Sequence, residues 1–390
     1  MTNLSDRANA AADELRVIFE FFQSYRKGVA DKDVVADLTF GNPHEMPLPE
    51  LVETLKTYIE PKRVDWFAYK TSEEEPREAV AAALGEELNL PFAPEDIAMT
   101  QGAFGAIALA FTLLMDPGDE CILPVPGWFC YSTILRAQNT VPVSVPLLDG
   151  SFNLDIDAIE HAITPRTRIV VVNSPHNPTG VVYSREHLID LAAMLERKSA
   201  EFGRPIFILS DEPYRRIRFD GVPFTSPAEV YPYTLIDYSY GKILLAPGLR
   251  FGYLAICPNM PNEIRTELSQ LAVSTQVAQG WGFPDAPMQY AVADLEKLSI
   301  DIDALQAKRN RMHDALTQWG YNMTKPAGTF YLWGRAPGGD AVSFTDALAK
   351  RGVYVMPGTL LDRPADFRIC LTANEGMIEA CLPFFEEFAE

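Results

Sequence analysis

The sequence has little positive charge and few residues of the kinds that bind metals. Its 390 residues include 33 Lys and Arg against 53 Asp and Glu, which gives a formal net charge of −20. Because binding to phosphates requires clustered cations, this balance excludes nucleic acid as a main partner. The five histidines have no paired spacing, and none of the five cysteines forms a CxxC pair. We therefore expect no metal site.

Long apolar runs and a signal peptide are also missing from the pattern. No apolar stretch reaches the length of about 20 residues that crosses a bilayer. The first residues, MTNLSDRANAAADELRVIFEFF, carry acidic side chains where a signal peptide has a basic start. An odd number of widely spaced cysteines is typical of reduced thiols. We expect a cytoplasmic protein that does not enter a membrane.

What the sequence does contain is an alternation of strand and helix patterns between residues 95 and 260. The strand-like segments are DIAMT, ECILPV, RIVVVNS, PIFILSD, YTLIDYS and GYLAICP. Such alternation predicts an α/β fold with a mainly parallel sheet covered by helices. A long helical pattern over 288–316 and the later strand patterns GTFYLWG, GVYVMPG and DFRICLT predict a smaller α+β domain. The predicted division is an arm with part of the small domain (1–45), a large domain (46–288) and a C-terminal small domain (289–390).

Unusual residues follow several of the predicted strands, where ligands bind in open α/β sheets. QGAFGA leads from a strand directly into a helix, whose free N–H groups form an anion site. NSPHNPTG, DEPY and SYGK…GLRFG follow the next strands in order. Taken singly, NPTG is a turn, Asp211 a helix cap, and Lys242 and Arg250 surface cations. Their common position at strand ends favours one shared site instead.

A dinucleotide site is a competing interpretation of the first glycine turn. GAFGA does not complete the G-x-G-x-x-G fingerprint, although Glu120 lies at a distance typical of the acidic residue in such sites. The incomplete glycine pattern makes this interpretation weak.

The motifs NSPHNPTG, DEPY and SYGK…GLRFG resemble those of the fold-type I pyridoxal-phosphate enzymes of the aspartate aminotransferase superfamily, class I/II. The resemblance extends from GNP at residue 41 to FRICLT at residue 367. It implies a large domain whose sheet is sandwiched by helices, a smaller domain, and pyridoxal 5′-phosphate as cofactor. The implied activity is an aminotransferase that moves an amino group from an L-amino acid to a 2-oxo acid.

The resemblance also assigns residues to the reacting end of the cofactor. Lys242 would form the Schiff base and move the α-proton, and Asp211 would pair with the pyridine nitrogen. Asn177 and Tyr214 would hydrogen-bond the phenolic oxygen. General chemistry agrees, because a buried lysine near another cation has a lowered pKa and a protonated pyridine nitrogen needs a carboxylate partner.

By the same resemblance, the cofactor phosphate is held by side chains and by the start of a helix. Trp128 in LPVPGWFCY would stack on the cofactor ring, with a core tryptophan as the alternative interpretation. The expected phosphate ligands are Arg250, Ser239 and the backbone N–H groups around Gly102, Ala103 and Phe104.

Arg368 is implied as the residue that grips the substrate's α-carboxylate, with Gly41 and Asn177 beside it. The apolar neighbours of Arg368 in FRICL argue against a surface salt bridge. The segment LAVSTQVAQGWGFPDAPMQY contains no Lys or Arg to bind a second carboxylate. We therefore expect apolar or aromatic amino acids as substrates, unless Lys70 or Arg63 reaches the site.

One motif departs from the family pattern. Relatives carry a tyrosine ten residues before an arginine, and this tyrosine contacts the partner subunit's cofactor phosphate. Counting back from Arg77 gives Phe67, and the usual glycine is Ser72. Tyr69 is the alternative candidate for this contact. A homodimer with active sites at the interface is still implied.

Two other functions remain open at this level. The same cofactor and lysine support a lyase, a decarboxylase or an oxidase, and a requirement for a 2-oxo acid would distinguish an aminotransferase from these. A non-catalytic effector-binding domain fused to a regulator would need a basic DNA-binding module. The first 35 residues are too short and too mixed in charge to supply one.

Overall fold

A computed structural model describes residues 5–389. Within these residues, a seven-stranded sheet forms the centre of the larger part of the molecule. Its strands are β2 (Ile97–Thr100), β3 (Glu120–Val125), β4 (Val141–Pro146), β5 (Thr167–Asn173), β6 (Phe207–Asp211), β7 (Thr234–Ser239) and β8 (Gly252–Ile256). The spatial order is β2-β8-β7-β6-β5-β3-β4.

The sheet is mainly parallel, as the alternation predicts. Strand β8 alone runs antiparallel to both of its neighbours, β2 and β7. The six strand-like segments identified from the sequence all lie in this sheet. The sequence patterns missed β4, whose segment VPVSVP contains two prolines. Prolines are tolerated there because β4 is an edge strand and one side of its backbone needs no partner.

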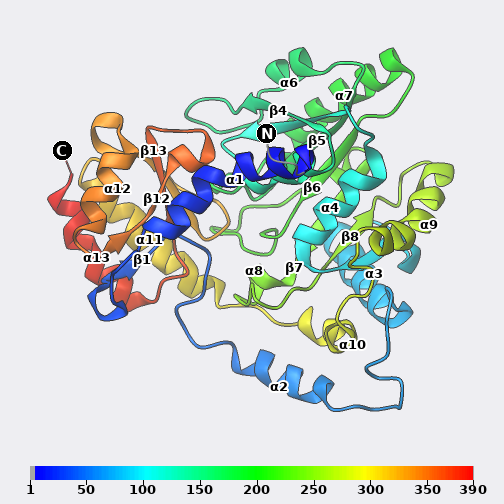
Figure 1. Ribbon diagram of the computed structural model, residues 1–390, viewed down its shortest axis with the longest axis horizontal. Coiled ribbons are helices and arrows are strands. Elements are labelled where there is room, and N and C mark those ends of the chain that lie inside the picture. The colour runs from blue at the N-terminus through cyan, green and yellow to red at the C-terminus, as the bar shows by residue number, and fades with distance from the viewer. Residues whose placement is uncertain (1–4, 390) are drawn as a thin grey trace.

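Helices cover both faces of the large sheet (Figure 1). On one face, side chains of β5 and β6 pack with α7, and on the other they pack with α4. Alternate residues therefore point to opposite apolar layers, as buried strands require. The α-helices described up to residue 295 are α1 (Asp6–Ser24), α2 (Pro49–Ile59), α3 (Glu74–Leu88), α4 (Gly102–Leu114), α5 (Cys130–Ala137), α6 (Ile156–Ala162), α7 (Arg185–Phe202), α8 (Tyr240–Ile243), α9 (Asn262–Ala278) and α10 (Ala286–Leu295).

Local sequence signals explain where several helices begin and end. The Ser184 side chain accepts a hydrogen bond from the backbone N–H of His187 and so caps the start of α7. Gly203, with φ of 67°, ends the same helix in the left-handed conformation. None of the helices in residues 5–389 is long and apolar enough to cross a membrane.

The C-terminal third forms a smaller unit with its own sheet, at the opposite side of the molecule from most of the large sheet (Figure 1). Strands β12, β13, β10 and β9 pair antiparallel in that order, and β1 pairs with β11. The N-terminal segment thus contributes to this unit. Its elements are β1 (Ala36–Asp37), β9 (Met323–Thr324), β10 (Tyr331–Arg335), β11 (Val353–Tyr354), β12 (Met356–Pro357), β13 (Asp366–Cys370), α11 (Ile302–Gln318), α12 (Ala341–Ala349) and α13 (Glu375–Glu387).

The long helix expected over 288–316 is two helices. Helix α10 packs on α2 and α3, whereas α11 packs on α13 of the smaller unit. The chain leaves one unit and enters the other between them, so a continuous helix would not reach both. The side chain of Asp301 accepts from the backbone N–H of Ala304 and begins α11 anew.

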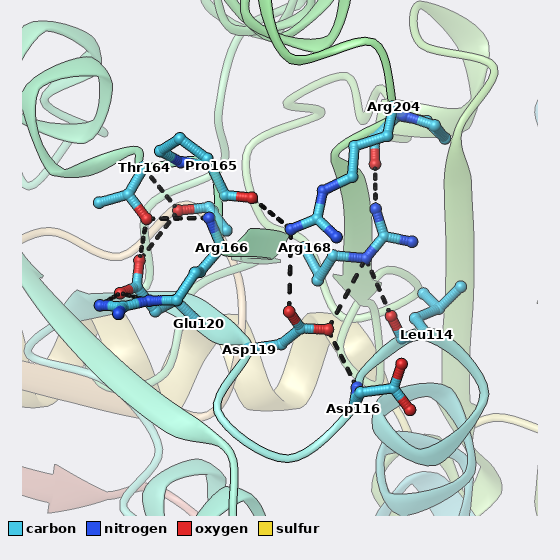
Figure 2. Close-up of polar contacts among 11 residues, drawn as sticks. Leu114, Asp116, Asp119, Glu120, Thr164, Pro165, Arg166, Arg168 and Arg204 are labelled. Carbon is cyan, nitrogen blue, oxygen red and sulfur yellow. Dashed lines mark hydrogen bonds and ion pairs between the residues drawn. The ribbon is translucent and has the colours of Figure 1, made fainter.

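Glu120 is the first residue of β3 and so lies at the amino end of this strand, away from the strand ends where ligands bind. Figure 2 shows the polar contacts around it. Arg166 Nε donates to its carboxylate at 2.9 Å, and Thr164 Oγ1 donates at 2.6 Å. Burial raises the pKa of Glu120, but these donors outweigh it and leave the pKa lowered. The neighbouring Asp119 lies within 4.0 Å of Arg168. Glu120 is thus part of an ionic cluster, and the dinucleotide interpretation is wrong for it.

Candidate active site

A cavity of about 230 Å³ lies at the carboxyl ends of the parallel strands. Residues that follow β3, β5, β6 and β7 line one side of it, and the smaller unit supplies Tyr331 and Arg368 on the other. Because β8 runs antiparallel, the residue just before it, Arg250, also lies at this edge. The topology therefore brings chain segments that are distant in the sequence to one place.

Lys242 lies in the short helix α8, directly after β7, and it is the single lysine among the described residues that line the cavity. Its side chain is partly buried, with the amine 5.6 Å from the centre of the Tyr214 ring. Burial, together with the charges of Arg368 and Arg250, lowers the pKa of Lys242 to about 8, against the opposing effects of Cys370 and Asp211. An amine in this range supplies both a nucleophile and a proton acceptor near neutral pH.

Asp211 ends β6 and is buried beneath the cavity. Its Oδ2 accepts hydrogen bonds from the Tyr131 hydroxyl and from Asn173 Nδ2, the latter at 3.1 Å. Its Oδ1 is buried without a hydrogen-bond donor in the described part of the chain. Burial raises the pKa of this carboxyl. A buried carboxylate oxygen left open at a cavity is suited to a cationic N–H from a ligand.

A second cluster gathers where α4 begins. Gly102 has φ of 73°, and a Cβ at this position would come within 3.0 Å of Arg250 Nη2 and 3.4 Å of Ser239 Oγ. Arg250 is held by the backbone carbonyls of Pro247 and Gln101, and it has no carboxylate partner among residues 5–389. The free N–H groups of a helix start, a hydroxyl and an unpaired guanidinium form an anion site.

Arg368 in β13 reaches the cavity from the smaller unit and is buried. It donates to Asn177 Oδ1 and to the carbonyl of Thr39, each at 3.0 Å, and stacks over Tyr331 at 4.2 Å. Its Nε has no acceptor within the described residues. A buried guanidinium without a carboxylate is an unsatisfied cation, so this is a second place for an anionic ligand.

Aromatic side chains complete the cavity wall. Tyr214 donates from its hydroxyl to the Tyr331 hydroxyl at 3.3 Å, and burial raises its pKa well above the usual value. Trp128 is packed edge-on against Phe104 and Tyr131, with ring centres 4.8 and 5.1 Å away. Its partial exposure at the cavity leaves surface for a planar ligand.

A family model described as aminotransferase class I and II matches residues 33–382. The chain belongs to the class I and II aminotransferases. It is 31% identical over 386 residues, 98% of this chain and 94% of the relative, to a probable aspartate/prephenate aminotransferase of Thermus aquaticus. The family and the relatives' names support aminotransferase activity over the other reactions considered above.

Solved structures of aminotransferases have the same fold. An amino transferase from Eubacterium rectale superposes with a TM-score of 0.91 at 30% identity, covering 100% of this chain and 98% of that one. The aspartate aminotransferase of Thermus thermophilus superposes with a TM-score of 0.81 at 28% identity, and each chain is covered completely. The fold-type I architecture predicted from the sequence is confirmed.

The residues of this aminotransferase fit the cofactor that its family implies. An open carboxylate oxygen at Asp211, a partly buried amine at Lys242 and the glycine-lined anion site at Gly102 and Arg250 border one cavity. In that order, they suit the three functional groups of pyridoxal phosphate: its pyridine nitrogen, its aldehyde and its phosphate. The family and its relatives imply this cofactor.

The structure places eleven of the predicted residues on the cavity wall and the twelfth, Gly102, directly behind it. The eleven are Gly41, Ala103, Phe104, Trp128, Asn177, Asp211, Tyr214, Ser239, Lys242, Arg250 and Arg368. The sequence interpretation missed Tyr131, which contacts Asp211, and Tyr331, which contacts Tyr214 and Arg368. Tyr131 lies within LPVPGWFCY and Tyr331 within GTFYLWG, but neither pattern indicates the distant residue that the tyrosine contacts.

Proposed function

We propose that this aminotransferase binds pyridoxal 5′-phosphate with Lys242 as the residue that bonds to its aldehyde. The observation that carries the proposal is the convergence of one amine, one open carboxylate oxygen and two arginines without carboxylate partners on one cavity. When bound, the cofactor supplies an electron sink for a carbanion. Asp211 then faces the pyridine nitrogen, and Lys242 Nζ takes the substrate's α-proton and returns it.

The other side chains orient the bound groups. Asn177 and Tyr214 act on the phenolic oxygen of the cofactor, and Trp128 lies against its ring. Ser239, Arg250 and the N–H groups of Gly102, Ala103 and Phe104 hold the phosphate. This set is supported by their common position around the cavity, and by the fact that Arg250 contacts backbone carbonyls but no carboxylate in residues 5–389.

Arg368 binds the substrate's α-carboxylate in this proposal, with Asn177 and Gly41 beside it. Asn177 already fixes one arm of the guanidinium. A Cβ at Gly41 would approach the Phe330 ring to 2.9 Å, so glycine is required for the chain to pass this close to the site. The guanidinium is thus preorganised, which lowers the entropy lost when a carboxylate is bound.

We infer a preference for amino acids with apolar or aromatic side chains. Phe40, Phe104 and Phe129 line the cavity, and Lys242, Arg250 and Arg368 are its only cations among the described residues. Lys70 and Arg63, the two cations considered as ligands for a distal substrate carboxylate, are both paired with Asp65 of their own loop. Lys70 Nζ and Arg63 Nε each lie 2.9 Å from a carboxylate oxygen of Asp65.

Aspartate is the second candidate, because several relatives are named for it. These include the aspartate aminotransferase of Thermotoga maritima, which is 29% identical over 363 residues, and the enzymes named aspartate/prephenate aminotransferase. In the cavity described here, a distal carboxylate would find no cation beyond the three already assigned. Desolvating an unpaired carboxylate is costly, which disfavours aspartate.

A panel of amino donors decides between the two candidates. Aromatic, aliphatic and acidic amino acids are assayed against 2-oxoglutarate and pyruvate, and kcat/KM is compared. We expect aromatic or aliphatic donors to be best. If aspartate or glutamate exceeds every other donor by about tenfold, roughly 1.4 kcal/mol of transition-state binding, the apolar preference is wrong. Turnover without any 2-oxo acid would instead contradict transamination.

We further propose a cytoplasmic homodimer with active sites at the interface. Tyr69 is 88% exposed and its ring lies 5.2 Å from that of the exposed Phe283. Phe67 is less exposed, at 58%. This supports Tyr69 over Phe67 as the residue that contacts the partner's cofactor phosphate. Sedimentation should give twice the chain mass, and Tyr69→Phe should weaken cofactor binding more than Phe67→Leu does.

The proposed domain division keeps the sequence boundaries, with an arm and part of the small domain over 1–45, a large cofactor domain over 46–288 and a small domain over 289–390. Pairing of β1 with β11 supports the assignment of the first segment to the small domain. Packing of α10 against α2 and α3 favours a boundary a few residues later than 288, at the end of α10. Limited proteolysis with mass analysis of the fragments tests the boundary.

A further inference from the structure

Asp237 is a buried carboxyl that no part of the proposed mechanism uses. It lies on β7 opposite Asp211 of β6, and the two are register partners in parallel strands. Because side chains of a strand alternate, Asp237 shares its face with Ser239, which lines the cavity. Its exposed fraction is 0%. A second carboxyl therefore lies beside the one assigned to the pyridine nitrogen.

The surroundings of Asp237 offer a carboxylate nothing that would stabilise its charge. Neither of its oxygens accepts a hydrogen bond from any donor in the described part of the chain. Helix α4, which packs on β7, has the sequence GAFGAIALAFTLL and carries no ionisable side chain. An unpaired ionised carboxylate is more costly to bury in such a place than an unpaired neutral polar group. A protonated carboxyl instead needs only one acceptor.

The strand register brings one acceptor beside Asp237, the carboxyl of Asp211. Burial raises the pKa of Asp237 well above its usual value, and the charge of Asp211 and the hydrogen bond between the two carboxyls raise it further. The same hydrogen bond lowers the pKa of Asp211. Two carboxyls this close in a dry site cannot both ionise, so the pair holds one proton and one charge.

The charged and titratable groups around the pair act on its two members unequally. From β6 and the residue after it, Asp211 and Glu212 both disfavour ionisation of Asp237. From α5, Tyr131 donates to Asp211. From α8, the positive charge of Lys242 lowers the pKa of Asp211. The negative charge of the pair therefore belongs on Asp211 and the proton on Asp237.

We propose that Asp237 is a positioning residue of the active site, a protonated carboxyl that donates its hydrogen to Asp211 and keeps Asp211 ionised and aimed at the cofactor's pyridine nitrogen. The proposal rests on the proposed function, because it gives Asp211 that partner. Asp237 itself does not line the cavity and touches no reacting atom.

The first test uses the cofactor-free protein and requires no activity. If Asp237 takes up a proton on folding, stability should fall as the pH rises from 5 to 8, because the folded state then binds more protons than the unfolded state. Asp237→Asn removes this proton. We expect the folding equilibrium constant of the wild type to fall about tenfold more per pH unit than that of the variant in urea unfolding. Equal pH slopes would overturn the proposal.

The second test measures binding of pyridoxal 5′-phosphate by equilibrium dialysis. Asp237→Val removes the donor, and the dissociation constant should rise about tenfold or more, the worth of a hydrogen bond to a charged group. Asp237→Asn keeps an N–H donor and should bind as tightly as the wild type. Asp237→Val should also be no less stable than the wild type without cofactor at pH 7. Weakened affinity with preserved stability is not what a merely structural role would give.

Glu212→Gln is the matched control. Glu212 is as deeply buried, and burial raises its pKa to about 7, but its carboxylate is held by Ser210, Ser226 and Arg215 instead of facing Asp211. The Glu212→Gln variant should bind pyridoxal 5′-phosphate as tightly as the wild type. A loss equal to that of Asp237→Val, or an Asp237→Asn variant as weak as Asp237→Val, would overturn the proposal.

The outcomes separate this inference from the proposed function. If borohydride reduction fails to label Lys242 in the wild type, the proposed function is wrong while the pH slope of the cofactor-free protein still stands. If Lys242 is labelled but the slope and the affinities do not change with Asp237, the function holds and the role of Asp237 does not.

Discussion

Replacement of Arg368 by lysine tests how the site recognises amino acids. The guanidinium is fixed by Asn177 and by the carbonyl of Thr39, each at 3.0 Å, and by stacking 4.2 Å above Tyr331. Its Nε–H has no acceptor. The arginine is thus held in place with a donor free for a carboxylate. Lysine keeps the charge but cannot present two parallel N–H groups, and it loses the stacked contact.

The magnitude follows from the bonds that are lost. One charge-assisted hydrogen bond contributes about 1.5–3 kcal/mol, so Arg368→Lys should lower kcat/KM for amino donors by roughly 10- to 100-fold. Arg368→Gln removes the charge as well and should lower it further. Because the charge of Arg368 also depresses the pKa of Lys242, the glutamine variant should raise that pKa in the cofactor-free protein.

The assay compares kcat/KM for the best amino donor in the wild type and both variants, with cofactor affinity as the control. Arg368 contacts no residue of the proposed phosphate site, so the dissociation constant of pyridoxal 5′-phosphate should stay within about twofold. A loss below about threefold in kcat/KM for Arg368→Lys would refute the carboxylate assignment, since this is under 1 kcal/mol. A parallel loss of cofactor affinity would refute the separation of the two arginine sites.

Three further results are expected. Asp211→Ala should raise the barrier to proton abstraction by several kcal/mol, and added cofactor should not reverse this effect. Arg250→Ala should chiefly weaken cofactor binding. Full rescue of the activity of Asp211→Ala by added cofactor would show that the two roles are misassigned. Lys242→Met should stabilise the cofactor-free protein below pH 8. Because the pKa of Lys242 is lowered in the folded state, wild-type stability should grow as the pH rises toward 10.5, and the stability difference between the two proteins should vanish. A stability difference in urea unfolding that does not change with pH would contradict this. Gly102→Ala should weaken cofactor binding, because the added Cβ would press on Arg250. Gly118 has φ of 89° and open space around it, so Gly118→Ala should lower stability through backbone strain and leave cofactor binding unchanged. Equal cofactor affinities in the two variants would contradict the phosphate site.

The strand ends were the predictable part of this protein. Parallel strands deliver their carboxyl ends to one edge, so residues such as Asp211 and Lys242 could be grouped from their order in the sequence alone. Arg250 belongs to the same group for a different reason, because it precedes the antiparallel strand β8. The sequence spacing was sufficient here even though the direction of β8 was not predicted.

Contacts between distant segments were not predictable in the same way. Tyr131 and Asp211 are 80 residues apart, and Tyr214 and Tyr331 are 117 apart. No periodicity or motif connects them. Asp237 was hidden for a related reason, since it sits inside an apolar strand pattern and its partner is supplied only by the pairing of β6 with β7. The break between α10 and α11 depends on packing against two units, which helical periodicity does not record.

The identity of the lysine that bonds to the cofactor is the central claim, and one measurement tests it directly. Protein saturated with pyridoxal 5′-phosphate is reduced with borohydride, digested and analysed by peptide mass spectrometry. We expect the reduced phosphopyridoxyl group on Lys242 in stoichiometric amount, and none on the Lys242→Ala variant, which should still bind the cofactor through its phosphate site. Recovery of the group on any other lysine, or equal labelling of the variant, would contradict the account.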